Sequence, residues 1–221
     1  MSIYEELING LTNSETPLQD IFLKLKILAC KLQNETLTKF VDLELNGYDD
    51  KNIPRYRWIK GMLMATVSNG YYTHKNYRLP TYHLKKYKLQ NLEICKMGES
   101  IGALVEYANR QEDNLCKIIP PEFFNYFNEL LEDTYCIQRI HIPISRGNIK
   151  GILTSIRSKI LDLILGIEKE LNVNGLEGLF NNPTKEEQNK ANKIVNNFIH
   201  NTFNSYGEST QNTKIELGTD K

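Results

Sequence analysis

The stretch ELNGYDDKNIPRYRW, residues 44–58, separates two parts of the chain that differ in pattern and in charge. Asn46-Gly47 follows a segment with helical spacing, and glycine ends a helix readily because it adopts a left-handed backbone conformation without a Cβ penalty. The block Pro54-Arg55-Tyr56-Arg57 comes next, and no acidic residue follows it until Glu93. We therefore expect helices before this stretch and a basic segment of a different structure after it.

Three helix-start signals precede Gly47. Ser2 and Glu5 fit a capping box, Thr16-Pro17 places an N-cap residue before a proline, and Asn34 is a suitable N-cap for a further helix. Apolar residues recur at helical spacing over 18–32 and 37–45, which predicts one buried face on each of these helices. Helices joined by so short a turn normally lie antiparallel.

The pattern after residue 57 favours strands. Residues 58–67 and 71–78 alternate in part between apolar and polar side chains, and Ser68-Asn69-Gly70-Tyr71 predicts a type I′ hairpin between them. Residues 82–96 are ambiguous, with a third strand as one option. Residues 136–144 are expected to form an edge strand, because Pro143 has no N–H to donate to a neighbour.

Helices are predicted again from Ser100, from Pro120-Pro121 and over 148–172, where a broad apolar face ends at Asn174-Gly175. The expected fold class is α+β and mostly α. It consists of a helical bundle formed by residues 1–172, with an antiparallel β-hairpin or small sheet inserted at about 58–96.

Residues 173–221 differ in composition and are expected to form an asparagine-rich polar tail with one short apolar segment, 194–206. So small a patch cannot form a core alone, so it is expected to dock on the main body or on another copy of the chain. The candidate residues for self-association are Ile194, Val195, Phe198, Ile199 and Phe203.

Charge is unevenly distributed along the chain. The totals balance, with 27 basic and 27 acidic residues, but 51–92 holds nine basic residues, no acidic residue and many tyrosines. Cations beside exposed aromatic rings suit single-stranded nucleic acid, because they neutralise phosphates while the rings stack on bases. The candidate nucleic-acid-binding residues are Arg55, Arg57, Lys60, Lys75, Arg78, Lys85, Lys86, Lys88, Tyr71 and Tyr72.

A structural interpretation of this basic segment competes with the nucleic-acid one. Tyrosines favour strands and can cover a helical layer, and the basic side chains can balance the acidic first fifty residues of the same molecule. The chain contains no recognisable RNA- or DNA-binding motif, which favours the structural interpretation.

Motifs for catalysis and metal binding are missing from the sequence. There is no GxSxG, HExxH, Walker loop or GxGxxG, and the four histidines and four cysteines do not fall in ligand spacing. No catalytic residue, metal or cofactor is therefore predicted. The N-terminal residues lack the pattern of a secretion signal, and no apolar run reaches the roughly 20 residues of a membrane span, so a cytoplasmic location is expected.

One resemblance adds to this interpretation. The run LKLKILACKLQNETLTKFVDLELNGYDDKNIPRYR, residues 23–57, resembles the signature of the AbiTii family of bacterial abortive-infection proteins. The matching parts are Lys24 to Ala29, Glu44 to Tyr48, and Ile53 to Arg57, with Ile53 where the family typically has leucine. SIGALVEYA (100–108) and GILTSIRSKILDLILGIEKEL (151–171) resemble later helices of the family, so the similarity extends over about 5–172.

The resemblance implies a role in anti-phage defence, and it implies no catalytic residues. Three hypotheses follow: a non-enzymatic interaction or effector module that self-associates or docks on a partner defence protein, a nucleic-acid-binding protein that uses 51–92, and a cryptic nuclease. The signature residues Asn46, Gly47, Tyr48, Pro54 and Tyr56 are expected to have structural roles, with Gly47 and Pro54 fixing the turn and Tyr56 packing against the preceding helix.

Overall fold

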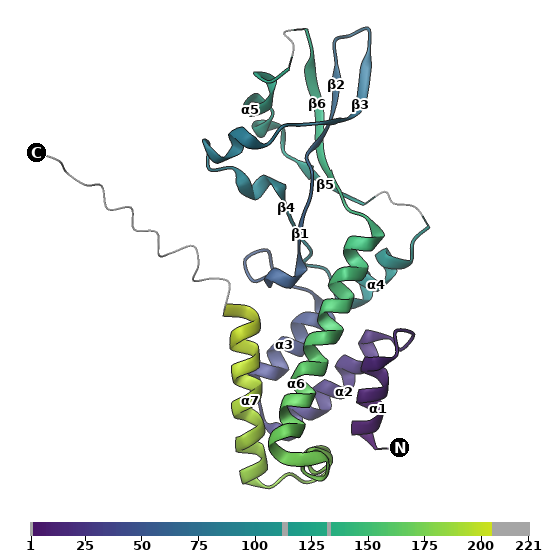
Figure 1. The fold of residues 1–221 in the computed structure, drawn as a ribbon, viewed down its shortest axis with the longest axis vertical. Helices are drawn as coiled ribbons and strands as arrows, with labels where there is room; N and C mark the ends of the chain where they lie inside the picture. The colour runs from purple at the N-terminus through teal and green to yellow at the C-terminus, as the bar shows by residue number, and fades with distance from the viewer. Residues whose placement is uncertain (1, 112–114, 132–133, 205–221) are drawn as a thin grey trace, which may run out of the picture. The chain divides into compact units, whose positions relative to one another are not determined.

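The structure, a computed structural model, describes residues 2–111, 115–131 and 134–204, apart from the side chains of 173–176, 203 and 204. These residues are mostly helical and include two antiparallel sheets (Figure 1), which confirms the predicted α+β class. The chain divides into two compact units. The helical unit takes the described residues of Met1–Tyr56, Glu99–Gly102 and Leu153–Lys221, and the sheet unit takes those of Arg57–Gly98 and Ala103–Ile152.

The helical unit begins with three helices whose starts and ends follow local rules. These are α1 (Ile3–Thr12), α2 (Leu18–Leu32) and α3 (Glu35–Asn46). The predicted capping box of α1 is present, with the Glu5 backbone N–H donating to Ser2 Oγ at 3.2 Å and the Ser2 N–H donating to Glu5 Oε2 at 3.0 Å. Helix α3 ends at Gly47, whose φ of 102° lies in the region that favours glycine. The predicted Thr16 cap is wrong by one residue, because Pro17 occupies the N-cap position of α2 without a side-chain hydrogen bond.

Helix α6 (Arg146–Phe180) contributes its residues from Leu153 onward to the same unit, and α7 (Lys185–Asn204) follows it. The predicted end of the long helix at Asn174-Gly175 is replaced by a kink at Asn172, whose φ of 58° and ψ of 174° are not helical. Helix α7 packs against α2 and α3 (Figure 1), so described residues beyond 172 belong to the helical unit.

The apolar segment of α7 faces its own unit. Val195 and Ile199 are buried, and Ile194 and Phe198 are half-buried, because residues spaced four apart share the helix face turned inward. The side chain of Phe203 lies outside the described residues. Val195 and Ile199 are therefore not available for the expected self-association.

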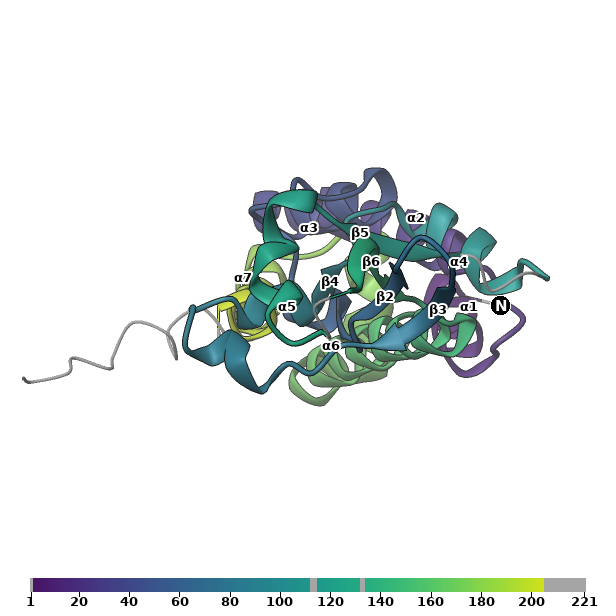
Figure 2. The same cartoon turned by 90° about the horizontal axis from the view of Figure 1, so that it is seen from above.

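The sheet unit contains six strands in two antiparallel sheets, counted over the residues that the structure describes. They are β1 (Trp58–Lys60), β2 (Met64–Ser68), β3 (Thr73–Arg78), β4 (Ile94–Lys96), β5 (Cys116–Ile119) and β6 (Cys136–Pro143). Strands β1 and β4 form one sheet, and the other has the order β3-β2-β6-β5, which Figure 2 shows from above. Short helical segments join them: η1 (Arg55–Arg57), η2 (Tyr82–Lys85), η3 (Gln90–Glu93), α4 (Ile101–Asn109), η4 (Pro121–Phe123) and α5 (Asn125–Asn128).

Three strand predictions need correction. Residues 58–67 form two strands instead of one, and β1 pairs with β4 while β2 pairs with β3. Strand β6 lies inside the sheet, between β2 and β5, because Pro143 is its last residue and costs no hydrogen bond in the strand interior. The sheet therefore draws on 116–119 and 136–143, well beyond the expected insertion at 58–96.

The β2–β3 connection is a hairpin, but its loop is longer than the predicted type I′ turn. Ser68 pairs with Thr73, which leaves four loop residues, and only Gly70 among them has a positive φ, at 89°. The Asn69 side chain accepts hydrogen bonds from the backbone N–H groups of Tyr71 (3.0 Å) and Tyr72 (2.8 Å). An Asx-type loop therefore replaces the tighter turn.

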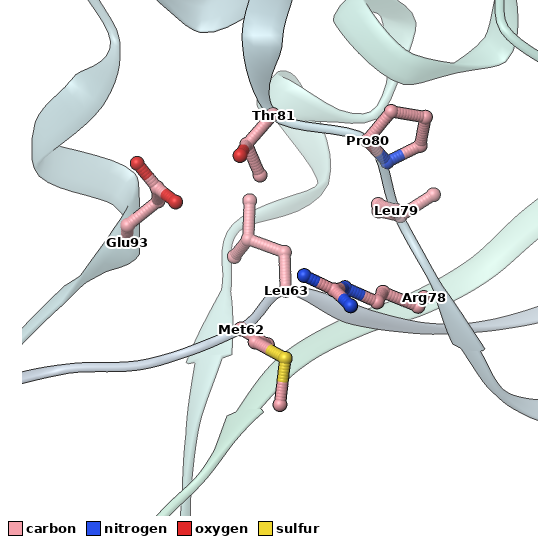
Figure 3. A pocket seen from close by; sticks show the side chains of 7 residues that line it. All are labelled: Met62, Leu63, Arg78, Leu79, Pro80, Thr81 and Glu93. Carbon is pink, nitrogen blue, oxygen red and sulfur yellow. The ribbon is translucent and has the colours of Figure 1, made fainter.

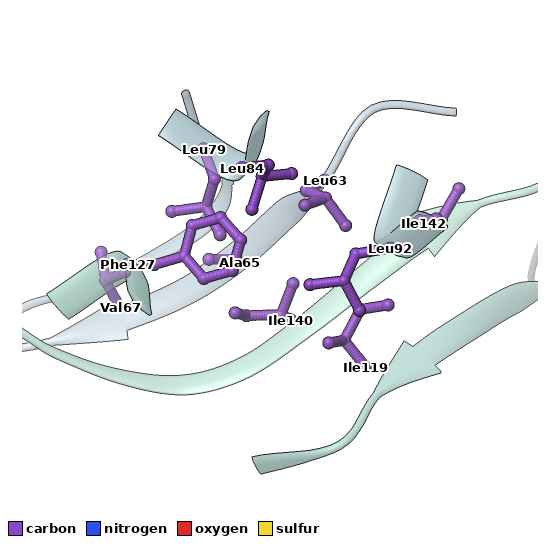
Figure 4. Packing of buried hydrophobic residues seen from close by; sticks show 10 residues of the cluster. All are labelled: Leu63, Ala65, Val67, Leu79, Leu84, Leu92, Ile119, Phe127, Ile140 and Ile142. Atoms are coloured by element: carbon purple, nitrogen blue, oxygen red, sulfur yellow. The ribbon is translucent and has the colours of Figure 1, made fainter. Parts of the chain in front are cut away.

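The core of the sheet unit lies on one face of the four-stranded sheet. Alternate residues of β2 and β6 point to this face, where Leu84, Leu92 and Phe127 from helical segments cover them. Figure 4 shows the buried cluster of Leu63, Ala65, Val67, Leu79, Leu84, Leu92, Ile119, Phe127, Ile140 and Ile142. Strand β3 contributes nothing to this cluster before Leu79, and all six of its residues are exposed.

A substitution of Asn34 tests how α7 is held in the helical unit. Asn34 is buried, its Oδ1 accepts from the Leu37 N–H (2.8 Å), and its Nδ2 donates to Asn192 Oδ1 (2.8 Å) and Asn196 Oδ1 (3.1 Å). Asn34→Ala removes a helix cap and two hydrogen bonds to α7, so we expect the free energy of unfolding to fall by about 2 kcal/mol. Urea unfolding followed by circular dichroism measures this loss.

The matched control for Asn34→Ala is Asn189→Ala, at an exposed position of α7. Alanine is the better helix former, so this variant should unfold with unchanged or slightly higher stability. Equal stabilities of the two variants would show that Asn34 does not hold α7.

Candidate functional site

The surface of β3 and of the loop before it carries exposed aromatic and basic side chains. Tyr71 is 92% exposed, Tyr72 68% and Tyr77 43%, and Lys75 and Arg78 lie exposed on the strand. We call these five residues the β3 surface. The Asn69 hydrogen bonds fix the loop backbone that presents Tyr71 and Tyr72, and Gly70 supplies the positive φ that the loop requires.

A second group of exposed basic residues belongs to the same unit, on and near η2. Lys85, Lys86 and Lys88 are exposed there, and Lys60 is exposed at the end of β1. Tyr82 is 77% exposed, and the rings of Tyr87 and Tyr126 lie 5.0 Å apart between centroids. Tyr126 was missed by sequence reasoning, because it lies outside 51–92 and only the fold brings it to Tyr87.

Arg57 and Arg55 differ from the other candidate nucleic-acid contacts. Arg57 is fully buried, and its Nη1 donates to the Met97 carbonyl at 3.2 Å, so it is withdrawn from the expected interface. Arg55 is exposed but belongs to the helical unit. The remaining candidates all lie exposed in the sheet unit: Lys60, Tyr71, Tyr72, Lys75, Arg78, Lys85, Lys86 and Lys88.

Ion pairing leaves much of this positive charge uncompensated. Lys60, Lys75, Arg78, Lys85 and Lys88 have no ion-pair partner among the residues that the structure describes. In the acidic N-terminal part, Glu6 pairs with Lys24 (3.0 Å) and Asp42 with Lys26 (2.7 Å). These two acids, on α1 and α3, are therefore balanced by lysines of α2 and not from 51–92.

The signature residues form a buried polar cluster in the helical unit. The Glu44 carboxylate is fully buried on α3, and its Oε1 accepts from the hydroxyls of Tyr48 (2.7 Å) and Tyr56 (2.5 Å). The two hydroxyls lie 3.3 Å apart. Burial raises the pKa of Tyr56 well above its usual value, and the negative charge of Glu44 raises it further. Tyr56 therefore stays protonated and donates to the carboxylate.

This Glu44 cluster holds the segment after α3 against the helix. Ile53 and Pro54, which precede Tyr56 in the chain, are buried, and Gly47 turns the chain after α3. The exposed Asn46 donates from Nδ2 to the Asp42 carbonyl at 2.9 Å. Each of the five signature residues is thus placed where a structural role is physically reasonable. The hydroxyls of Tyr48 and Tyr56 both donate to the buried Glu44 carboxylate, so this cluster offers no exposed group to a ligand. The β3 surface is therefore the exposed candidate site.

Two further properties concern the described residues only. No three histidine, cysteine, aspartate or glutamate side chains among them lie close enough to hold a metal ion. None of the described helices is both long enough and apolar enough to cross a membrane.

The fold and its sites define a mostly helical α+β protein with a buried carboxylate–tyrosine cluster and an exposed basic, aromatic strand. The family model AbiTii matches residues 2–193, so the chain belongs to the AbiTii family, a family of abortive infection proteins. Comparisons with curated proteins and with solved structures found no significant match.

Removing one hydroxyl tests the Glu44 cluster. Tyr56→Phe leaves the buried carboxylate with one hydrogen-bond donor fewer, so we expect the free energy of unfolding to fall by about 1–3 kcal/mol. Tyr71→Phe removes a hydroxyl from an exposed side chain and should leave stability unchanged. Chemical denaturation of both variants at neutral pH measures the difference, and a Tyr56→Phe variant as stable as the native protein would contradict the role of the cluster.

The raised pKa of Tyr56 also predicts a pH dependence. Because the folded-state pKa lies above the usual value of 10.0, the contribution of Tyr56 to stability is complete below pH 10.0 and is lost as the pH rises beyond it. The native protein should therefore lose stability above pH 10.0 more steeply than Tyr56→Phe. Denaturation curves on both sides of this pH measure the two slopes, and parallel slopes would count against the prediction.

Proposed function

We propose that this AbiTii protein serves abortive infection by binding single-stranded nucleic acid through the β3 surface, acting by contact and not by making or breaking bonds. Family membership supports the defence role. The exposure of Tyr71 and Tyr72 beside cations without ion-pair partners supports the ligand. This proposal takes up the nucleic-acid-binding hypothesis for 51–92 in preference to the self-associating module, because Val195 and Ile199 of the 194–206 segment are buried.

Tyr71 and Tyr72 are the observation that carries the proposal. Rings exposed to this degree contribute little to the core, and the buried cluster of the sheet unit is complete without them. A base stacked on one such ring gains about 1–3 kcal/mol, and every base has a face that can stack. Phosphates between the bases would meet Lys75, and the released counterions favour binding at low salt.

A second candidate function is docking of a partner protein by strand addition. Strand β3 is at the edge of its sheet, so one side of its backbone has no strand beside it in the described part of the chain. An extended peptide can add to such an edge through main-chain hydrogen bonds. This mode depends weakly on salt and hardly on the tyrosine rings, which separates it from nucleic-acid binding.

Fluorescence anisotropy with short single-stranded RNA and DNA tests the proposal. We expect binding that weakens steeply between about 50 and 200 mM salt. Tyr71→Ala with Tyr72→Ala should weaken it at least tenfold, since about 1–3 kcal/mol of stacking is lost for each base. The matched pair Tyr71→Phe with Tyr72→Phe keeps both rings and should bind as the native protein does.

Charge variants supply the second arm of this experiment. Lys75→Gln with Lys85→Gln should lower the slope of log K against log salt by about 0.7 for each phosphate that is no longer neutralised. Lys39→Gln with Lys169→Gln removes two exposed charges from the helical unit and should leave the slope unchanged. Failure of the native protein to bind any strand at low salt would overturn the proposal, and cleavage of the strand would favour the nuclease hypothesis.

Phage restriction in cells connects binding with defence. The alanine pair at 71 and 72 should lose restriction, and the phenylalanine pair should retain it. Equal restriction by both pairs would separate the β3 surface from the defence role.

A further inference from the structure

A cavity of about 330 Å³ lies at the end of β3, within the sheet unit. Figure 3 shows its lining, which consists of Met62, Leu63, Arg78, Leu79, Pro80, Thr81 and Glu93. The volume is at the lower end of the range for small-ligand sites, which suits one planar ring system better than a large cofactor.

Backbone hydrogen bonds connect the segments that form the walls. The Leu79 N–H donates to the Leu63 carbonyl at 3.0 Å, and the Gly61 N–H donates to the Glu93 carbonyl at 2.9 Å. Leu63 and Leu79 also belong to the buried cluster of the unit. The cavity is therefore part of a packed structure, and its shape does not depend on a free loop.

Two opposite charges face this cavity without meeting. Arg78 and the half-buried Glu93 lie on opposite sides of Leu63 (Figure 3), and neither has an ion-pair or hydrogen-bond partner for its side chain among the described residues. The Thr81 hydroxyl lies on the same side as Glu93. A ligand that satisfies both charges needs donors on one edge, acceptors on another, and an apolar face for Leu63 and Leu79.

Guanine has this combination of edges. Its N1–H and N2–H₂ groups are adjacent donors that match the two oxygens of the Glu93 carboxylate, and its O6 and N7 are the acceptors that arginine binds in bidentate fashion. Adenine and cytosine each place an acceptor beside their amino group on this edge, and uracil offers a single N–H between two carbonyls. A carboxylate therefore discriminates against all three.

The cavity shares one residue, Arg78, with the β3 surface. Tyr77 directly precedes Arg78 and is 43% exposed, and Tyr82 directly follows Thr81 and is 77% exposed. A strand held by the β3 surface with a base stacked on Tyr82 would pass the cavity with one base free to enter it.

We propose that this cavity receives a single guanine base, with Glu93 reading its Watson–Crick edge and Arg78 its O6 and N7. The proposal rests on the proposed function, since it makes the β3 surface selective for guanine-containing single strands. The same chemistry would accept a free guanine nucleotide, so the experiment includes both sources.

Binding of oligouridine strands that differ at one central position tests the proposal. A central guanosine should bind about tenfold more tightly than uridine or adenosine at that position. A central inosine, which lacks the 2-amino group, should lose a large part of this gain. Guanosine monophosphate is titrated as a competitor, so that competition identifies the free nucleotide as a ligand and its absence confines recognition to the strand.

Glu93→Gln is the decisive variant, because the amide presents an N–H₂ group to the donors of guanine. It should abolish the preference for guanosine, so that strands with guanosine or uridine at the central position bind equally well. Glu122→Gln makes the same chemical change at an exposed position of the sheet unit and should retain the preference.

The outcomes separate this inference from the proposed function. The guanine site is overturned if the native protein binds all the strands with equal affinity, or if the preference for guanosine survives Glu93→Gln. Salt-dependent binding of the strands would still uphold the proposed function. If no strand binds, the proposed function fails. The guanosine monophosphate titration then tests the guanine site alone, and a lack of binding that depends on Glu93 overturns that site.

Discussion

A buried carboxylate constrains the helical unit. Glu44 has no access to solvent, and leaving such a charge without donors costs several kcal/mol. The hydroxyls of Tyr48 and Tyr56 donate to it from the segment after α3, so that segment must fold back on the helix. Tyr56 is also the residue at which the first part of the helical unit ends, and the sheet unit begins at Arg57. One electrostatic requirement thus fixes the path by which the chain leaves the helices.

Local rules in the sequence predicted much of the helical unit. The capping box at Ser2, the cap at Asn34, the stop at Gly47 and the apolar face of α2 each depend on residues within one or two turns. The errors lie where distant residues decide. Strand β6 is an inner strand because β5 pairs along its other side, and α7 is drawn to α2 and α3 by Asn34, which lies more than a hundred positions earlier.

The candidate site was predictable in composition but not in geometry. The excess of lysine, arginine and tyrosine over 51–92 can be counted, and most of these side chains are exposed. The burial of Arg57 could not be predicted from composition, because it depends on the tertiary fold that brings the Met97 carbonyl to its guanidinium. The placement of Arg78 and Glu93 around one cavity likewise arises only once β3 and η3 are folded next to Leu63.

The edge position of β3 has a consequence for solubility. An edge strand with exposed aromatic side chains is a template for pairing between molecules, and charged side chains on the strand oppose this through mutual repulsion. Lys75 and Arg78 therefore keep molecules apart, and they are the same charges that would attract the polyanion proposed as the ligand. A bound polyanion would neutralise that repulsion, so occupancy of the surface and aggregation of the protein are physically coupled.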